Sequence, residues 1–295
     1  MKTNELTHQV HEFWNKASCD THIAAADKFT KDYFEEIEAY RYYDQPFIHK
    51  FAQFSRYRGK MVLEIGFGAG TDFIQWLRAG AVATGIDLTE EALANLQQRI
   101  KVYGLPQPRQ LVVGSAEDLP FPTASFDLVY SFGVLHHCAD TLRALSEAVR
   151  VLRPGGELKI MLYNRHSILA LNTWVKHALA KGQPWKSLGW CLWNHVESTG
   201  TKGYTKKEIV DILEGLGIGR IAIETEVTSA DTLAAQAMPP LNAFFRLLIY
   251  LAGVNYPWQK KFYERGAGPF VNSNAKYSTG GSPLGFFHCI SGVKK

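Results

Sequence analysis

Cysteine is scarce in this sequence, and its few copies stand far apart. The chain has 295 residues and four cysteines, Cys19, Cys138, Cys191 and Cys289. None forms a C-x-x-C pair, so the spacing of a structural zinc site or of a disulfide framework is missing. Dispersed single thiols are typical of proteins that stay in a reducing compartment. We therefore expect no bound metal and a cytoplasmic location.

The sequence also lacks tracts of one charge and long apolar runs. Its formal net charge is only +4, and it has no lysine/arginine tract, which argues against a nucleic-acid partner. The first residues are polar and do not resemble a signal peptide. The most apolar run, residues 241–254, is too short to span a bilayer and contains Arg246. With 46% hydrophobic and 20% charged residues, the chain reads as globular, with no membrane partner expected.

A glycine-rich turn between two apolar runs is the most informative motif present. The run at residues 62–65 leads into Gly66, Gly68 and Gly70, and a second run ends in Asp87. A strand, a glycine turn, a helix and a strand with an acid at its tip are typical of a nucleoside-binding unit. The glycines let a ligand approach the backbone, and the carboxylate accepts hydrogen bonds from ribose hydroxyls.

The spacing of these glycines distinguishes between cofactors. Dinucleotide sites use G-x-G-x-x-G, whereas this chain has G-x-G-x-G, with Thr71 where the dinucleotide pattern wants a small residue. Glu64 stands shortly before the first glycine, and a carboxylate there suits a ligand with a cationic end and no phosphate. S-adenosylmethionine carries an ammonium and a sulfonium group and no phosphate, so the pattern favours it over NAD.

Four sequence blocks together resemble the class I S-adenosylmethionine-dependent methyltransferases. They are residues 62–70, 85–88, 116–129 and 152–156, and they follow the family's order and spacing. The resemblance covers residues 55–165 well and residues 204–227 and the last strand more loosely. It implies an α/β fold, a doubly wound Rossmann-like sheet of seven strands in which strand 7 runs antiparallel between strands 5 and 6.

The alternation of apolar runs with helical patterns predicts the same architecture. Strands are expected at 61–66, 82–87, 110–114, 126–132, 157–163, 219–227 and 286–293. Helices are expected after Gly70, at about 89–104 and 140–152, and from the capping box at 205–208 onward.

The chain is predicted to have three kinds of segment. Residues 1–57 form an N-terminal helical lid, and residues 58–227 and 284–295 form the S-adenosylmethionine-binding core. Residues 164–204 and 228–283 are two inserts that form a substrate cap. The first insert holds four of the seven tryptophans.

The resemblance assigns roles to residues at the carboxyl ends of the strands, where ligands of open α/β sheets bind. It implies that the three loop glycines border the methionine part of the cofactor, that Glu64 helps to fix its ammonium group, and that Asp87 binds the ribose diol. Leu88 is expected against the adenine, and Ser131 and Phe132 beside the sulfonium. The family commonly has an aspartate for the adenine amine where this chain has Ser115, so that contact is expected from Ser115, Ala116 or Glu117.

Three histidines are candidates for a catalytic base, because imidazole titrates near neutral pH. His136 and His137 follow strand 4, and His195 lies in the polar segment 194–204. A packing role is the alternative for one of the first two. Substrate contacts are expected from the end of strand 5 and from that polar segment, at Tyr163, Asn164, Glu197, Lys202 and Tyr204. An ordered loop with Glu197 and Lys202 as a surface pair is the alternative.

These features predict methyl transfer from S-adenosylmethionine to a small-molecule acceptor, with S-adenosylhomocysteine as product. The displacement depends mainly on proximity and alignment. The acceptor stays open between a specialised metabolite, an isoprenoid methylated at carbon, and an amino acid or other polar acceptor methylated at nitrogen, oxygen or sulfur. A macromolecule methyltransferase is disfavoured because no N-P-P-Y-type motif follows strand 4. A non-catalytic S-adenosylmethionine-binding protein is a further alternative, and a homodimer is compatible with the sequence.

Overall fold

The computed structural model describes residues 3–229, 231 and 282–295. The second insert, expected at 228–283, therefore lies almost entirely outside the described residues, as does the apolar run 241–254.

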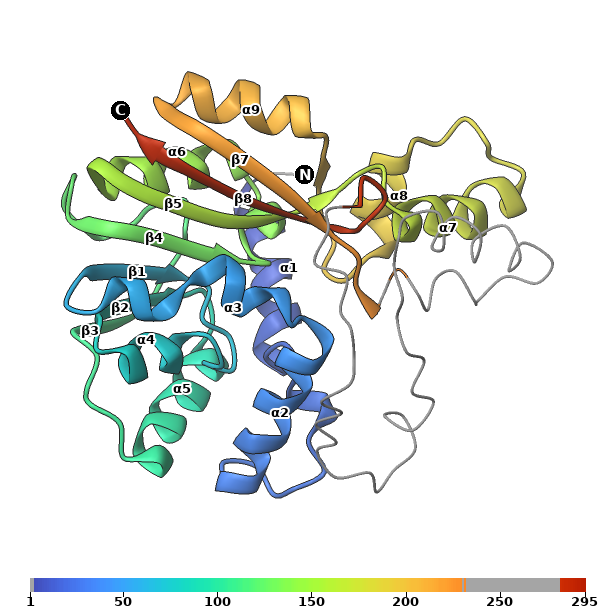
Figure 1. Ribbon diagram of the computed structural model, residues 1–295. Coiled ribbons are helices and arrows are strands. Elements are labelled where there is room, and N and C mark those ends of the chain that lie inside the picture. The colour runs from blue at the N-terminus through green and yellow to red at the C-terminus, as the bar shows by residue number, and fades with distance from the viewer. Residues whose placement is uncertain (1–2, 230, 232–281) are drawn as a thin grey trace.

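The described strands form one mixed sheet in the order β3-β2-β1-β4-β5-β8-β7, with β6 beside β5 (Figure 1). The parallel strands on one side are β1 (Met61–Ile65), β2 (Val82–Asp87), β3 (Gln110–Val113), β4 (Phe126–Phe132) and β5 (Leu152–Asn164). β8 (Phe287–Lys294) pairs antiparallel with both β5 and β7 (Ile218–Glu226). The predicted doubly wound fold is confirmed, including the antiparallel last strand between its two neighbours.

Two details of the sheet differ from the prediction. β5 begins at Leu152 and not at 157, because Leu152 already pairs with Phe126 before a bulge at 153–156 brings Glu157 opposite Leu128. Gly155 allows this bulge with a φ of 75°. β6 (Gly203–Tyr204) was not predicted, since two residues are too few to show a period of alternation.

Helices cover both faces of the sheet, as Figure 1 shows. The core on one face is built with α3 (Phe47–Ala52), α4 (Phe73–Ala79) and α5 (Glu90–Tyr103), and on the other with α6 (Thr141–Val151) and α9 (Lys206–Gly215). Neighbouring strand residues alternate between the two layers, with Val62 in the first and Leu63 in the second. The predicted capping box at Thr205 and Glu208 is present at the start of α9.

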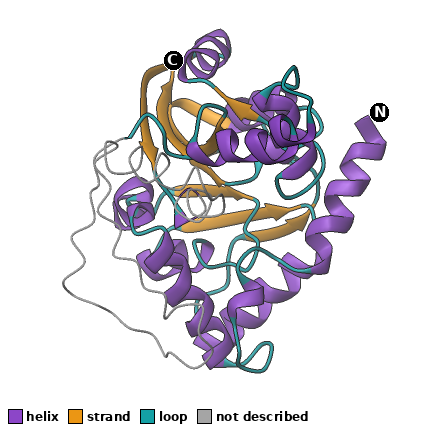
Figure 2. Ribbon diagram, turned by 90° about the vertical axis from the view of Figure 1, so that its right-hand side faces the viewer, coloured by secondary structure: helices purple, strands orange, loops and turns teal. Residues whose placement is uncertain are grey.

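The remaining helices gather at the end of the sheet where the parallel strands finish (Figures 1 and 2). α1 (Thr3–Lys16) and α2 (Lys31–Asp44) come from the N-terminal segment, and α7 (Ile168–His177) and α8 (Leu188–His195) from the first insert. Short 3-10 turns at Thr21–Ile23, Phe54–Tyr57, Leu135–His137 and Leu179–Lys181 complete the described helical structure. The lid and cap roles of these segments stay predictions.

One buried guanidinium joins the N-terminal segment to the core. Arg99 in α5 is fully buried, and its Nη1 donates to the Ala69 carbonyl at 3.1 Å and to Thr71 Oγ1 at 2.7 Å. Its Nη2 donates to the Phe34 carbonyl at 3.0 Å and to Glu38 Oε2 at 3.1 Å. α5, the glycine loop and α2 are therefore held by a single side chain.

Arg99→Lys is expected to lower the free energy of unfolding by about 2–4 kcal/mol, because one ammonium group cannot reach all four acceptors on the glycine loop and α2 and leaves buried oxygens unpaired. Urea unfolding of the purified variant measures this. Arg109→Lys, at an exposed position, is the matched control and should change stability by less than about 0.5 kcal/mol. Equal losses in the two variants would contradict the role given to Arg99.

Candidate active site

A cavity of about 310 Å³ opens at the carboxyl ends of the strands. The loops after β1, β2, β3 and β4 form its floor, and Tyr163 on β5 continues it. Side chains of α1 and α2, among them Trp14 and Arg41, line it from the N-terminal segment. Such cavities of roughly 300–1,000 Å³ are the usual size for small-molecule sites.

The three glycines of the glycine loop have different surroundings. Each has a positive φ, of 77° at Gly66, 51° at Gly68 and 76° at Gly70. A Cβ on Gly66 would lie 2.1 Å from Val134 Cγ2, and one on Gly70 would lie 2.7 Å from Leu96 Cδ1, whereas one on Gly68 would meet no atom within 4 Å. Gly66 and Gly68 line the cavity, but Gly70 does not, because it lies against α5.

Asp87 fixes the tip of β2 against this loop. Its Oδ2 accepts from the Gly68 N–H at 2.9 Å, and its Oδ1 accepts from the N–H and hydroxyl of Thr89 at 3.0 and 2.9 Å. Burial raises the pKa of Asp87 more than these hydrogen bonds lower it. The carboxylate lines the cavity where the sequence predicted a ribose contact.

A buried carboxylate pair lies at the methionine end predicted for the cofactor. Arg41 donates to Asp72 twice, from Nε to Oδ1 at 3.1 Å and from Nη2 to Oδ2 at 2.8 Å. Glu64 accepts from Trp76 Nε1 at 2.7 Å. The sequence analysis missed the pairing of Arg41 with Asp72, since Arg41 lies in an aromatic helix and Asp72 at a helix start, where an acid is common for local reasons.

The two carboxylates of this pair differ in protonation. Burial alone would raise the pKa of Asp72, but the charge and hydrogen bonds of Arg41 and the hydroxyls of Tyr130 and Tyr42 outweigh it and lower that pKa. Burial and the neighbouring Asp72 charge raise the pKa of Glu64 well above its usual value. We therefore assign the proton of the pair to Glu64.

Most of the other predicted cofactor residues line the cavity. Leu88, Ser115, Ala116, Glu117 and Phe132 do so. Ser131 does not, because its hydroxyl donates to the Ile65 carbonyl at 2.9 Å and joins β4 to β1. These cofactor roles stay predictions.

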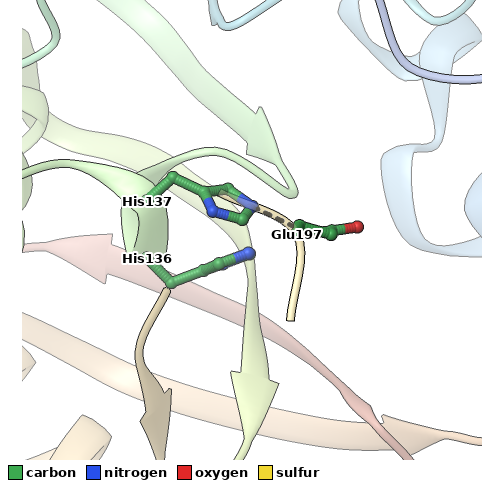
Figure 3. A group of neighbouring side chains, drawn as sticks. All are labelled: His136, His137 and Glu197. Carbon is green, nitrogen blue, oxygen red and sulfur yellow. Dashed lines mark ion pairs between the residues drawn. The ribbon is translucent and has the colours of Figure 1, made fainter. Parts of the chain in front are cut away.

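His137, Tyr163 and Glu197 meet at the other end of the cavity, beyond β4 and β5. Figure 3 shows His137 and Glu197 joined by their ion pair. His137 Nε2 lies 3.1 Å from Glu197 Oε2, and the Tyr163 hydroxyl donates to the same oxygen at 2.8 Å. The other ring nitrogen of His137, Nδ1, lies 3.0 Å from Thr201 Oγ1 and 3.1 Å from Ser198 Oγ. The structure thus joins three of the predicted site residues in one cluster.

His136 has a different environment from its neighbour. It is fully buried, its ring lies 3.7 Å from the ring of Tyr163, centroid to centroid, and it does not line the cavity. Burial and the adjacent His137 lower the pKa of His136 well below its usual value, so it is neutral. His136, His137 and Glu197 each bring one ligand atom to within 4.8 Å of the others, but the direct contact of His137 with Glu197 explains this proximity without an ion.

Four other predicted residues lie outside the cavity lining. His195 ends α8, and its ring stacks on His177 with centroids 4.0 Å apart. Asn164 donates to the Pro283 and Gly285 carbonyls, Lys202 Nζ to the Cys138 carbonyl at 2.6 Å, and Tyr204 pairs with Asn164 in β6. The side chains of Asn164 and Lys202 thus bind backbone carbonyls, and the catalytic and substrate roles of these four residues stay predictions.

The comparisons with known proteins agree with this geometry. Residues 63–160 match a family model described as a methyltransferase domain. Residues 63–160 form a class I S-adenosylmethionine-dependent methyltransferase domain. The family predicted from the four sequence blocks is therefore confirmed.

Relatives match part of the chain. A phosphatidylethanolamine N-methyltransferase from Cereibacter sphaeroides is 34% identical over 133 residues, which are 45% of this chain and 64% of the relative. A 27-O-demethylrifamycin SV methyltransferase from Amycolatopsis mediterranei is 35% identical over 103 residues, 35% of this chain and 38% of the relative. The chain thus spans less than two thirds of the length of these relatives.

A solved structure shares the fold across nearly the whole chain. A phosphoethanolamine N-methyltransferase 2 from Haemonchus contortus aligns with a TM-score of 0.54 and 19% identity, over 97% of this chain and 60% of its own. Among the described residues, we find no helix long and apolar enough to cross a membrane.

The raised pKa of Glu64 predicts a pH-dependent stability. A carboxyl group whose folded-state pKa is raised stabilises the fold fully below its ordinary value of 4.5 and loses that contribution as the pH rises. Glu64→Gln can still accept from Trp76 and has no charge. Its unfolding free energy relative to the wild type should therefore rise by about 1 kcal/mol or more between pH 5 and pH 8.

Urea unfolding of the cofactor-free proteins at the two pH values measures this difference. Glu214→Gln, at an exposed position of α9, should show no such change. A pH-independent difference for Glu64→Gln would show that Glu64 is ionised throughout.

Proposed function

We propose that this chain transfers a methyl group from S-adenosylmethionine to a small-molecule acceptor held in the same cavity. The observation that carries this proposal is the extent of the cavity. It runs from Gly68 and Asp87, beside β1 and β2, to Tyr163 and Glu197, beyond β5. The residues predicted to bind the cofactor and those predicted to bind the acceptor thus lie at the two ends of one cavity.

The residues at the first end fit the cofactor. Asp87 Oδ1 already accepts two hydrogen bonds from Thr89, whereas Oδ2 accepts one from Gly68, so Oδ2 can also accept a ribose hydroxyl without loss of the loop contacts. The open space beside Gly68 leaves the backbone accessible to a ligand. An ammonium group beside Glu64 would favour its ionised form, which offsets the burial of that charge.

The reaction needs little from the protein beyond alignment. The acceptor's lone pair forms the bond to the methyl carbon while the carbon–sulfur bond breaks and its electrons pass to sulfur. Aromatic residues of the cavity, among them Trp14, Phe132 and Phe286, limit the access of water. The names of similar methyltransferases specify small-molecule and lipid acceptors, which supports the proposal of a small-molecule acceptor.

Asp87→Asn is expected to weaken S-adenosylmethionine binding at least about tenfold, because the charged acceptor for the ribose is lost. Calorimetric titration measures it, and Asp118→Asn, an exposed acid beyond the adenine side, is the control. Failure of the folded wild type to bind S-adenosylmethionine would overturn the proposed function. Unchanged affinity in Asp87→Asn would overturn the ribose assignment alone.

A further inference from the structure

The contacts of His137 occupy both of its ring nitrogens. Nε2 forms an ion pair with Glu197 Oε2 at 3.1 Å. Nδ1 faces the hydroxyls of Ser198 and Thr201, both of which are buried. Since both ring nitrogens are engaged, His137 orients Glu197 and is not placed to remove a proton from a substrate.

Glu197, in contrast, has a carboxylate oxygen that can accept a hydrogen bond from a ligand. Tyr163 and His137 both contact Oε2 of its carboxylate, so within the described part of the chain Oε1 has no partner. The side chain lines the cavity with 36% of its surface exposed. Its backbone has a φ of 54°, which costs energy for a residue other than glycine and is typical of functional positions.

Glu197 is also held in its ionised form. Burial alone would raise its pKa, but the hydrogen bonds from His137 and Tyr163 and the charge of His137 outweigh it and lower that pKa. Burial and the nearby carboxylate raise the pKa of Tyr163, so this hydroxyl keeps its proton and donates. A fixed negative charge therefore faces the acceptor end of the cavity.

The described cavity wall favours a cation over an anion. It contains seven acidic side chains and one arginine, Arg41, whose guanidinium is already shared between Asp72 and Asp20. His137 also lines the cavity as the partner of Glu197, yet the acidic side chains still outnumber the cationic ones, even with Glu64 protonated and the cationic cofactor bound. The Tyr163 hydroxyl contacts Glu197 and the Trp14 ring packs edge-on against His137, so aromatic rings, whose faces attract cations, are part of this end of the cavity.

We propose that Glu197 binds the nitrogen of an amine acceptor, so that the enzyme is an N-methyltransferase; this inference rests on the function proposed above. The amine attacks in its neutral form, after its ammonium proton has passed to water. Its lone pair forms the bond to the methyl carbon, the carbon–sulfur bond breaks toward sulfur, and the new ammonium later loses a proton to water. Positive charge moves from sulfur to nitrogen, and the fixed carboxylate stabilises it there.

An alcohol acceptor fits this arrangement less well. It would have to lose its proton during the reaction, and a carboxylate with a lowered pKa is a weak base. The amine needs no base in the transition state, so the same carboxylate serves it by charge alone.

The test compares benzylamine, benzyl alcohol and benzoate, which share one ring and differ in their polar group. Calorimetry with saturating S-adenosylhomocysteine measures their binding to the wild type, Glu197→Gln and the control Glu214→Gln. The wild type and control should bind benzylamine at least about tenfold more tightly than the other two. Glu197→Gln, which keeps the side-chain length and the Tyr163 contact, should lose this preference and still bind S-adenosylhomocysteine within about twofold.

The outcomes separate this inference from the proposed function. If the wild type binds cofactor but shows no preference for benzylamine, or if Glu197→Gln keeps the preference, the amine assignment is wrong and the methyltransferase function stands. If the folded wild type binds neither S-adenosylmethionine nor its product, the proposed function itself fails.

Discussion

The buried ion pair between Arg41 and Asp72 is the contact on which the site depends. Asp72 stands at the start of α4, directly after the glycine loop, and Arg41 reaches it from α2. The pair fixes the N-terminal segment over the loop and gathers the hydroxyls of Tyr42 and Tyr130 on the same carboxylate. Because Asp72 is kept ionised, the adjacent Glu64 keeps its proton. Loss of either partner would leave an uncompensated buried charge, which is far costlier than loss of an exposed pair.

The two ends of the cavity use the same chemical group in opposite states. Glu64 is next to another carboxylate and is protonated, whereas Glu197 is bonded to a histidine and a tyrosine and is ionised. Burial raises the pKa of both groups, so the sign of the nearest charge decides the difference. This divergence of pKa values within one cavity is typical of active sites, where groups of one type perform different tasks.

Features that depend on neighbouring residues could be predicted from the sequence, and contacts between distant segments could not. The glycine loop, Asp87 and the capping box at Thr205 follow from local backbone rules, and the structure has them where expected. Arg41 pairs with Asp72, and His137 pairs with Glu197. Both contacts join distant parts of the chain, and no periodic pattern in the sequence indicates them. His195 ends a helix that was not predicted, α8, and its ring stacks on His177 outside the cavity lining, so its catalytic role stays a prediction.

The boundaries of the family match explain why the cofactor is easier to identify than the acceptor. Residues 63–160 contain Glu64, Asp72, Asp87 and His137, but not Arg41, Tyr163 or Glu197. The domain thus supplies Asp72 and His137, and the flanking segments supply their charged partners Arg41 and Glu197. One fold can accordingly retain its cofactor site while the segments around it change. If Glu197 binds the acceptor as proposed, the chemistry of the acceptor is set by the flanking segments.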